Sequence, residues 1–308
     1  MKSIKTKRSC PFCFDRSSSL FGTRDGAWLR CRACRSVFRD ITVDKFAQLH
    51  GAACQDSRFV DSVVGALGLE PAIGRWEALS MPGRSVLEIG PGTGHLLAAA
   101  RKAGRSVTAV ESSEVHRAFI RDAWGIESVY EDIADLPQGL KFDAVVAINV
   151  IEHVYNVAEF LRSIRNVLAP NGVIYMSTAN AASLEATLLG TWWSMCKDGD
   201  HVSLPSLVGM ARAARALNLR AERVWSSELP FELPISVLVA ARDWNRARRA
   251  ASFQPLDGHM PVASGQSGTS ATARLAHLYS VSAPFDPTSR LLSALGRGGS
   301  VKARLRPA

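Results

Sequence analysis

Short apolar runs alternate with amphipathic stretches between residues 41 and 246. Seven of these runs have the length and the β-branched content of buried strands. They are SVLEIG (85–90), SVTAVE (106–111), ESVYE (127–131), FDAVVAIN (142–149), GVIYMST (172–178), RAERVWS (220–226) and SVLVAAR (236–242). Strands separated by helices are typical of a sheet with crossover connections. The pattern predicts an α/β fold: a seven-stranded, mostly parallel sheet with helices on both faces.

Two helices between the later strands have clear sequence boundaries. The first begins at Asn156, where Glu159 three residues later completes a capping box. The second begins near Ser203, with Pro205 in its first turn. Both carry apolar residues at helical spacing, which predicts that they face the core: Val157, Phe160, Ile164 and Val167 in the first helix, and Leu207, Met210, Ala214 and Leu217 in the second.

The alternation of apolar runs and amphipathic stretches ends in the last part of the chain. Residues 257–272, DGHMPVASGQSGTSAT, are rich in Gly, Ser and Thr, which predicts a flexible linker. The segment SRLLSALGRGGSVKARLRPA (289–308) predicts one short helix and a basic tail. We therefore divide the chain into a small N-terminal module (1–40), a main domain (41–246) and a flexible basic extension (247–308).

Composition and charge indicate which classes of protein the chain can belong to. Apolar residues make up 47% of the chain and charged residues 21%, which is typical of a globular protein. No export signal or run of 18 apolar residues is present, so we expect a cytoplasmic protein without a membrane span. The net charge of +9 gathers at residues 1–40 and 242–308, which carry +7 each. Basic ends indicate either a nucleic-acid partner or solvated tails, and we favour solvated tails.

Four cysteines lie in the N-terminal module as CPFC (Cys10, Cys13) and CRAC (Cys31, Cys34), with 17 residues between the pairs. Two such knuckles supply four thiolates, the ligand set of a structural zinc ion. Zinc binding would stabilise so small a module by about 10 to 16 kcal/mol. The sequence therefore predicts a zinc ribbon. It departs from the usual ribbon because Phe14 and Arg35 stand where glycine commonly follows the second cysteine.

Three glycines at alternate positions follow the first strand of the main domain. Gly90 and Gly92 fit the start of the dinucleotide fingerprint G-x-G-x-x-G, but His95 occupies its third glycine position. A phosphate-binding loop is excluded because no G-K-[ST] follows. The spacing is E-x-G-x-G-x-G instead, from Glu88 to Gly94. A ligand without phosphates, which needs close backbone approach and a nearby acid, fits this loop.

From Val86 to Arg242 the chain resembles the class I S-adenosylmethionine-dependent methyltransferases, in particular the ubiquinone-biosynthesis type that acts on small molecules. The resemblance covers about half the chain and rests on motifs in family order. They are VLEIGPGTGHL (86–96), VTAVE (107–111), YEDI (130–133), FDAVVAINVIEHV (142–154) and VLAPNGVIYMSTAN (167–180). It implies a Rossmann-like fold and S-adenosylmethionine as the cofactor.

The resemblance assigns cofactor-binding roles to residues at successive strand ends. Glu88 would help to hold the methionine end, which needs the bare backbone of Gly90, Gly92 and Gly94. Glu111 would accept the ribose hydroxyls, and Asp132 would accept from the adenine amino group. The remaining residues are Ile133, whose backbone N–H would meet the adenine ring, and Asn149 at the end of the fourth strand.

The acceptor side follows the fourth strand. His153, in NVIEHV, is a candidate general base or acceptor-orienting residue, and an ordinary imidazole titrates near neutral pH. His201 matches a histidine that family members often carry before the next helix. Trp192 and Trp193 lie in the insert between them, where they either stack on a flat or glycosyl acceptor or form the hydrophobic underside of a lid.

Three functions are consistent with these patterns. We favour methyl transfer to oxygen or carbon of a small or medium-sized metabolite, with a glycosyl or lipid-linked precursor among the candidates. The first alternative is a zinc-ribbon RNA methyltransferase, because of the basic ends. The second is a non-catalytic cofactor-binding scaffold.

Overall fold

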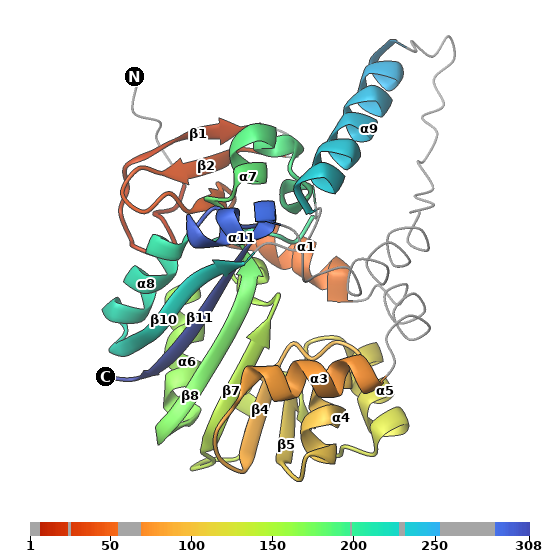
Figure 1. The fold of residues 1–308 in the computed structure, drawn as a ribbon, viewed down its shortest axis with the longest axis vertical. Coiled ribbons are helices and arrows are strands. Elements are labelled where there is room, and N and C mark those ends of the chain that lie inside the picture. Colours follow the sequence, from red (N-terminus) through yellow and green to blue (C-terminus); the bar gives the residue numbers. More distant parts are fainter. Residues whose placement is uncertain (1–6, 24–25, 55–68, 198, 228–231, 253–286) are drawn as a thin grey trace.

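The computed structural model describes residues 7–23, 26–54, 69–197, 199–227, 232–252 and 287–308. A seven-stranded sheet in the order β10-β11-β8-β7-β4-β5-β6 forms its centre (Figure 1). The strands are β4 (Ser85–Ile89), β5 (Ser106–Val110), β6 (Val129–Tyr130), β7 (Phe142–Ile148), β8 (Leu168–Ala179), β10 (Leu219–Ser227) and β11 (Ser300–Pro307). Neighbouring strands from β8 to β6 are parallel, whereas β11 is antiparallel to both β8 and β10. The predicted fold class is confirmed.

Helices cover both faces of this sheet. α3 (Leu69–Leu79) and α4 (His95–Lys102) pack on one face, and α6 (Val157–Val167) and α8 (Leu207–Ala216) pack on the other. α5 (Glu114–Trp124) packs beside β6. On β4, Val86 belongs to the α3 side and Leu87 to the α6 side. Because successive side chains point to opposite faces, a strand buried on both sides has a nearly continuous apolar sequence.

The two expected helix starts differ in outcome. The Asn156 side chain accepts a hydrogen bond from the backbone N–H of Glu159 at 3.2 Å, which confirms the predicted N-cap of α6. α8 begins at Leu207, and Ser206 caps it by accepting from the N–H of Gly209. It starts later than expected because Ser203 and Leu204 form a short strand, β9.

The seventh strand was predicted at the wrong place. Residues 236–242 belong to a helix, α9 (Glu232–Ser252). Among the α9 side chains that the structure describes, Ser236, Val239, Ala240 and Asp243 are buried or half-buried, at helical spacing. Asp243 pairs with Lys197 at 2.9 Å. A short apolar run is consistent with a strand and with a buried helix turn. Here the buried positions recur at helical spacing, as expected for a helix.

The real seventh strand, β11, lies in the segment predicted to be a basic tail. Val301, Ala303 and Leu305 are fully buried, whereas the cationic residues between them reach the surface. Before β11 the expected short helix is present as α11 (Pro287–Ala294). The expectation of an extension outside the fold is therefore wrong for residues 287–308, and the predicted linker at 257–272 lies outside the described residues.

The N-terminal module builds a second, four-stranded antiparallel sheet in the order β1-β2-β3-β9. β1 (Ser18–Gly22), β2 (Trp28–Cys31) and β3 (Val37–Arg39) come from the module, and β9 (Ser203–Leu204) comes from the main domain. α1 (Val43–Cys54) then leads away from β3. The module is therefore joined to the main domain through a shared sheet as well as through the chain.

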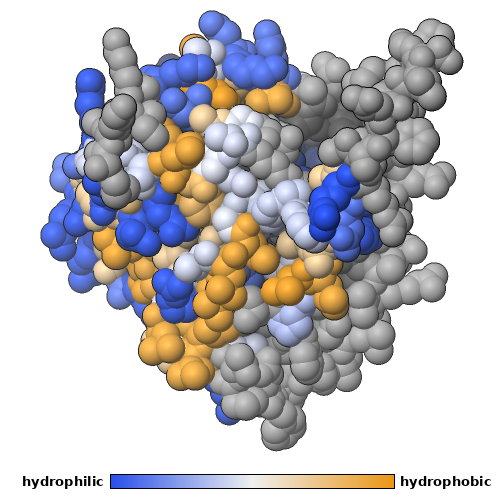
Figure 2. Space-filling model, turned by 90° about the horizontal axis from the view of Figure 1, so that it is seen from above, coloured by the Kyte–Doolittle hydropathy of each residue, from blue (hydrophilic) through white to orange (hydrophobic). Residues whose placement is uncertain are grey.

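Exposed large hydrophobic side chains gather on α7 (Leu184–Leu189), α9 and α11. These helices lie at the upper end of Figure 1, the end that Figure 2 shows from above, with hydrophobic patches among hydrophilic side chains. In the part of the chain that the structure describes, no helix combines the length and apolar character needed to cross a bilayer.

Candidate active site

The glycine loop connects β4 to α4 at the carboxyl edge of the parallel strands. Gly90, Gly92 and Gly94 have φ angles of 63°, 55° and 73°, in the left-handed region that favours glycine. At Gly90 a Cβ atom would also lie 2.6 Å from Cγ2 of Val150. The positive φ angles therefore favour glycine at all three positions, and at Gly90 the close approach of Val150 leaves no room for a side chain.

Glu88 lies one residue before the end of β4 and is only 6% exposed. Burial raises the pKa of its carboxyl to about 8, the Arg75 charge acts to lower it, and Glu111 acts to raise it. The carboxyl is consequently mostly protonated at neutral pH in the absence of a bound cation. Glu88 and Glu111 together form a pair of buried acids beside the glycine loop.

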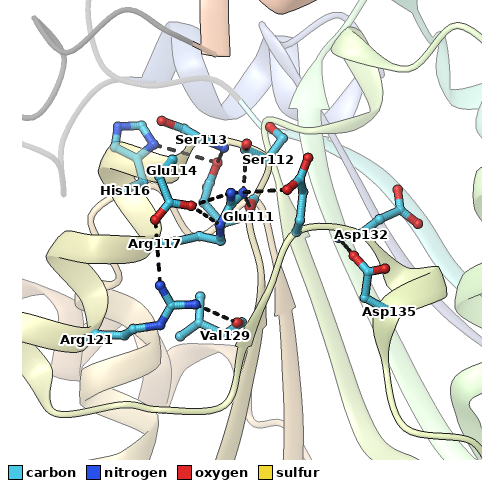
Figure 3. A network of polar contacts seen from close by, with 11 residues as sticks. Glu111, Ser112, Ser113, Glu114, His116, Arg117, Arg121, Val129, Asp132 and Asp135 are labelled. Carbon is cyan, nitrogen blue, oxygen red and sulfur yellow. Dashed lines mark hydrogen bonds and ion pairs between the residues drawn. The ribbon is translucent and has the colours of Figure 1, made fainter.

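Glu111 follows β5 and is held by backbone donors. Its Oε2 accepts from the N–H of Gly92 at 3.0 Å, and its Oε1 accepts from the N–H of Ser113 at 2.9 Å. Nδ1 of His116 lies 3.7 Å from the same Oε1 (Figure 3). Arg117 donates to the Glu111 carbonyl at 2.7 Å, which fixes the backbone here. The Glu111 carboxylate is thus oriented against the glycine loop.

Asp132, Ile133 and Asn149 occupy the next strand ends. Asp132 caps a short 3-10 turn, Ile133–Asp135, by accepting from the N–H of Ala134 at 2.8 Å. Its own N–H donates to Oδ2 of Asp135 at 3.0 Å (Figure 3). Asn149 is exposed after β7, has a φ of 54°, and donates its N–H to the Ser177 carbonyl at 2.7 Å. Because β7, β4, β5 and β6 are neighbours in this order, all predicted cofactor residues meet at one edge of the sheet.

His153 and His201 lie side by side at the same edge. His153 ends a 3-10 turn after β7 (Ile151–His153), and its ring centroid is 4.6 Å from that of the buried His201. Nδ1 of His153 lies 2.7 Å from Oδ2 of Asp200 in an ion pair. Burial acts to raise the pKa of Asp200, but its contact with His153 and the nearby His201 lower it below its ordinary value. The structure therefore brings the two predicted histidines into one group.

Glu152 adds a second carboxylate to this group and is 2% exposed. Its Oε2 accepts from the Thr178 hydroxyl at 2.7 Å. Burial raises the pKa of Glu152, against the opposing effects of His153, Thr178 and His201. The sequence assigned no chemical role to Glu152 or to Asp200. The signal for both was their place beside the two histidines, in EH and DH pairs.

Trp193 is a core residue. It is 4% exposed and packs in a hydrophobic cluster with Trp28 of the ribbon and Leu204 of β9. The insert that carries it forms two short 3-10 turns, Gly190–Trp192 and Ser194–Cys196. Trp193 is therefore a buried residue that joins the ribbon to the main domain, and its role under a lid stays a prediction.

The four ribbon cysteines converge as the zinc prediction requires. Their Sγ atoms lie within 4.8 Å of one another, and the Sγ distances are 3.6 Å for Cys10–Cys34 and 3.5 Å for Cys13–Cys31. The hydrogen bond with Cys10 lowers the pKa of the Cys34 thiol to about 5. The residues after each knuckle, Phe14 and Arg35, have φ angles of 62° and 68°. They adopt the backbone conformation for which other ribbons use glycine, so the geometry tolerates the departure.

Comparisons with known proteins show the family of this chain. A family model described as a methyltransferase domain matches residues 68–224. The mitochondrial ubiquinone biosynthesis O-methyltransferase of Arabidopsis thaliana is 34% identical over 106 residues, which cover 32% of this chain and 33% of that protein. The ubiquinone biosynthesis O-methyltransferase of Stutzerimonas stutzeri is 31% identical over 114 residues, covering 34% and 48%.

A solved structure, a SAM-dependent methyltransferase from Archaeoglobus fulgidus, has a TM-score of 0.50 at 14% identity and covers 81% of this chain and 99% of its own. That likeness shows the fold. The chain spans one third to about half the length of the curated relatives given above. By the family match over residues 68–224, the chain belongs to the methyltransferase-domain family, and its sheet order and glycine loop give it the fold of the class I S-adenosylmethionine-dependent methyltransferases.

Proposed function

We propose that this chain transfers a methyl group from S-adenosylmethionine to oxygen or carbon of a small or medium-sized metabolite. The observation that carries the proposal is the joint position of the glycine loop, the buried acids Glu88 and Glu111, and the pair His153 and His201 at one sheet edge. The names of the relatives favour oxygen as the acceptor atom. A cytoplasmic location stays a prediction.

The residues present suit a cationic ligand without phosphate groups. Glu88 would face the ammonium of the methionine end, and Gly90 and Gly92 would let the ligand approach the backbone. Glu111 keeps acceptor capacity for ribose hydroxyls, since a carboxylate offers about four lone-pair sites and two backbone donors occupy part of them. Asp132 and the backbone of Ile133 would meet the adenine.

When bound, S-adenosylmethionine supplies an electrophilic methyl group on a sulfonium. The task of the chain is to align the acceptor about 3 to 3.5 Å from that methyl carbon and to exclude water. His153 is close to Val150, whose side chain approaches Gly90, so an acceptor beside His153 would lie next to the cofactor. His153 and His201 then hold the acceptor or take its proton.

The ribbon argues for the metabolite function over the RNA alternative. A single-strand platform needs exposed aromatic rings on which bases stack. Phe12, Trp28 and Phe38 of the ribbon are all fully buried, and Phe14 is 43% exposed. We propose that the four cysteines hold one zinc ion with a purely structural role, since four thiolates leave no open position.

Calorimetric titration with S-adenosylmethionine tests the cofactor site. We expect binding by the wild-type chain and a large loss in Glu111→Ala, because that change removes the acceptor for the ribose hydroxyls. Asp122→Ala, which removes an exposed acid on α5, is the matched control and should bind normally. No binding by the wild-type chain would sink the proposal.

Labelled cofactor distinguishes the acceptor classes. The full chain is incubated with a metabolite extract or with total RNA, each at two salt concentrations. We expect label in the metabolites. Label in RNA, with binding that falls steeply with salt, would support the RNA alternative instead. Cofactor binding without label in either fraction would favour the scaffold.

A further inference from the structure

We infer that Arg117 of α5 is a positioning residue for Glu111, and that it acts through the main chain that follows β5. Its side chain is only 8% exposed, and its guanidinium donates to the backbone carbonyl of Glu111. The inference rests on the proposed function, in which the Glu111 carboxylate accepts the ribose hydroxyls of S-adenosylmethionine. Arg117 needs no contact with the cofactor to affect how tightly it binds.

The Arg117 guanidinium uses all of its N–H donors. Nη1 donates to the carbonyl oxygens of Glu111 at 2.7 Å and Ser112 at 2.8 Å (Figure 3). Nε donates to Oε2 of Glu114 at 2.9 Å, and Nη2 donates to the same oxygen and to Oε2 of Glu131 at 3.2 Å. A guanidinium has five N–H donors in a rigid planar fork. Its orientation is therefore fixed by partners on several sides.

Burial decides which of these partners matter most. The side chains of Glu114 and Glu131 are 70% and 68% exposed, and ion pairs of exposed groups contribute little. By contrast, the hydrogen bond to the Glu111 carbonyl is buried and the one to Ser112 is partly buried. Hydrogen bonds from a charged donor are stronger than neutral ones, and a buried carbonyl is costly to leave unpaired. The two carbonyl contacts therefore carry the effect of Arg117.

The turn that Arg117 holds is the same turn that orients the Glu111 carboxylate. Oε1 of Glu111 accepts from the N–H of Ser113, two residues further on, and Oε2 accepts from the N–H of Gly92. Ser113 is the N-cap residue of α5 but makes no side-chain cap hydrogen bond. Its hydroxyl is buried without a hydrogen-bond partner in the described part of the chain. Because this usual support of a helix start is missing, the Arg117 fork supports the turn instead.

Lysine cannot replace Arg117 in this role. Its ammonium keeps the charge, but its three donors radiate from one nitrogen and lack the planar fork that holds two neighbouring carbonyls. A shift of the turn would move Oε1 of Glu111 together with the Ser113 N–H that it accepts from. The ribose hydroxyls would then meet a misdirected carboxylate. Arg117→Lys should therefore weaken recognition of the ribose in particular.

Calorimetric titration of the full chain with S-adenosylhomocysteine and with its 2′-deoxy analogue tests the inference. We expect the wild type to prefer S-adenosylhomocysteine at least about tenfold, because the analogue leaves part of a buried carboxylate unpaired. Arg117→Lys should weaken S-adenosylhomocysteine about 10- to 100-fold and the analogue only about threefold or less. The preference between the two ligands is thus the readout, since general destabilisation would weaken both equally.

Arg121→Lys is the matched control on the same helix. Arg121 donates to the Val129 carbonyl at 3.0 Å and lies 3.9 Å from Oε1 of Glu114, so this change spares the turn after β5. It should keep the wild-type preference. Arg117→Gln, whose amide can still donate to one carbonyl, gives the same readout if circular dichroism shows Arg117→Lys to be unfolded.

The outcomes separate this inference from the proposed function. A wild type that binds neither ligand would contradict the cofactor site itself. A wild type that prefers S-adenosylhomocysteine, together with a folded Arg117 variant that keeps the same preference, would overturn only the positioning role. Equal losses for both ligands would also overturn it, because Arg117 would then support the fold without directing Glu111.

Discussion

Glu88 is the residue where burial and charge oppose each other most directly. Burial raises its pKa to about 8, so roughly nine in ten molecules carry the carboxyl proton at pH 7. An ammonium placed beside it would stabilise the ionised form and lower that pKa again. Cofactor binding and proton release are therefore linked at this residue.

We expect cofactor binding near pH 7 to release close to one proton per chain, and binding above pH 9 to release almost none. Calorimetry in buffers of different ionisation enthalpy measures the number. Glu88→Gln should abolish the release. An observed binding enthalpy that is the same in every buffer would contradict this linkage.

The same pKa affects the stability of the free protein. A carboxyl that is protonated in the folded state and ionised in the unfolded state destabilises the fold as pH rises. For Glu88 this loss develops between about pH 4.5 and pH 8, and it is complete above the folded pKa. Glu88→Gln should flatten that part of the stability profile.

The sequence predicted the position of individual candidate residues where a motif places them at strand ends. Glu111 contacts the glycine loop, and Asp132 follows β6 at the same sheet edge, because neighbouring parallel strands bring their carboxyl ends together. Asp200 escaped prediction because its partner His153 lies 47 residues earlier, and no local pattern encodes that contact. Contacts between side chains from different loops are visible only once the fold is known.

At the scale of elements, β9 is the part that joins the ribbon to the acceptor side. Val202, directly before β9, donates its N–H to the Glu152 carbonyl at 2.7 Å and accepts from the N–H of Arg39 in β3 at 3.1 Å. The Arg39 guanidinium also donates to the Gly199 carbonyl. The segment that carries His201 is therefore held between the ribbon and the turn after β7.

Loss of the proposed ribbon zinc should impair the proposed methyl transfer more than cofactor binding. Cys31→Ser removes one thiolate, and we expect a fall in kcat/KM of at least about tenfold, because β3 no longer holds His201 in place. Calorimetric affinity for S-adenosylmethionine should change little. Equal losses of affinity and turnover would indicate general unfolding instead.

The two misread strands show what limits prediction at this scale. Residues 236–242 are apolar and β-branched, yet they form α9 because packing continues at helical spacing to Asp243. VKARLR (301–306) alternates apolar and cationic residues, the clearest period-two pattern in the chain, but its charge suggested a tail. Arg304 and Arg306 pair with Glu222 on β10, so those charges lie along the sheet.

At the scale of the whole molecule, β11 completes the sheet between β8 and β10. Eight residue pairs join it to β10 and six join it to β8. Without β11, both neighbours would present unpaired backbone groups and an uncovered apolar core.

Leu305→Ala should lower the free energy of unfolding by about 2 to 5 kcal/mol, because its side chain is fully buried. Arg306→Ala, one position along the same strand, is the control and should cost about 1 kcal/mol or less. Urea unfolding of the full chain measures both. Similar small effects at the two positions would mean that the last strand contributes little to the core.

The position of β11 between β8 and β10 also has a consequence for cleavage of the chain into two fragments. β11 pairs with β10 and β8, and all residues of these two strands precede residue 228. β11 itself follows residue 299. If the chain were cleaved once between Ser252 and Pro287, the two fragments should therefore stay associated. The C-terminal fragment contains β11, which forms backbone hydrogen bonds with β10 on one edge and with β8 on the other. The same two pieces, produced separately, should reassemble by complementation and restore the sheet.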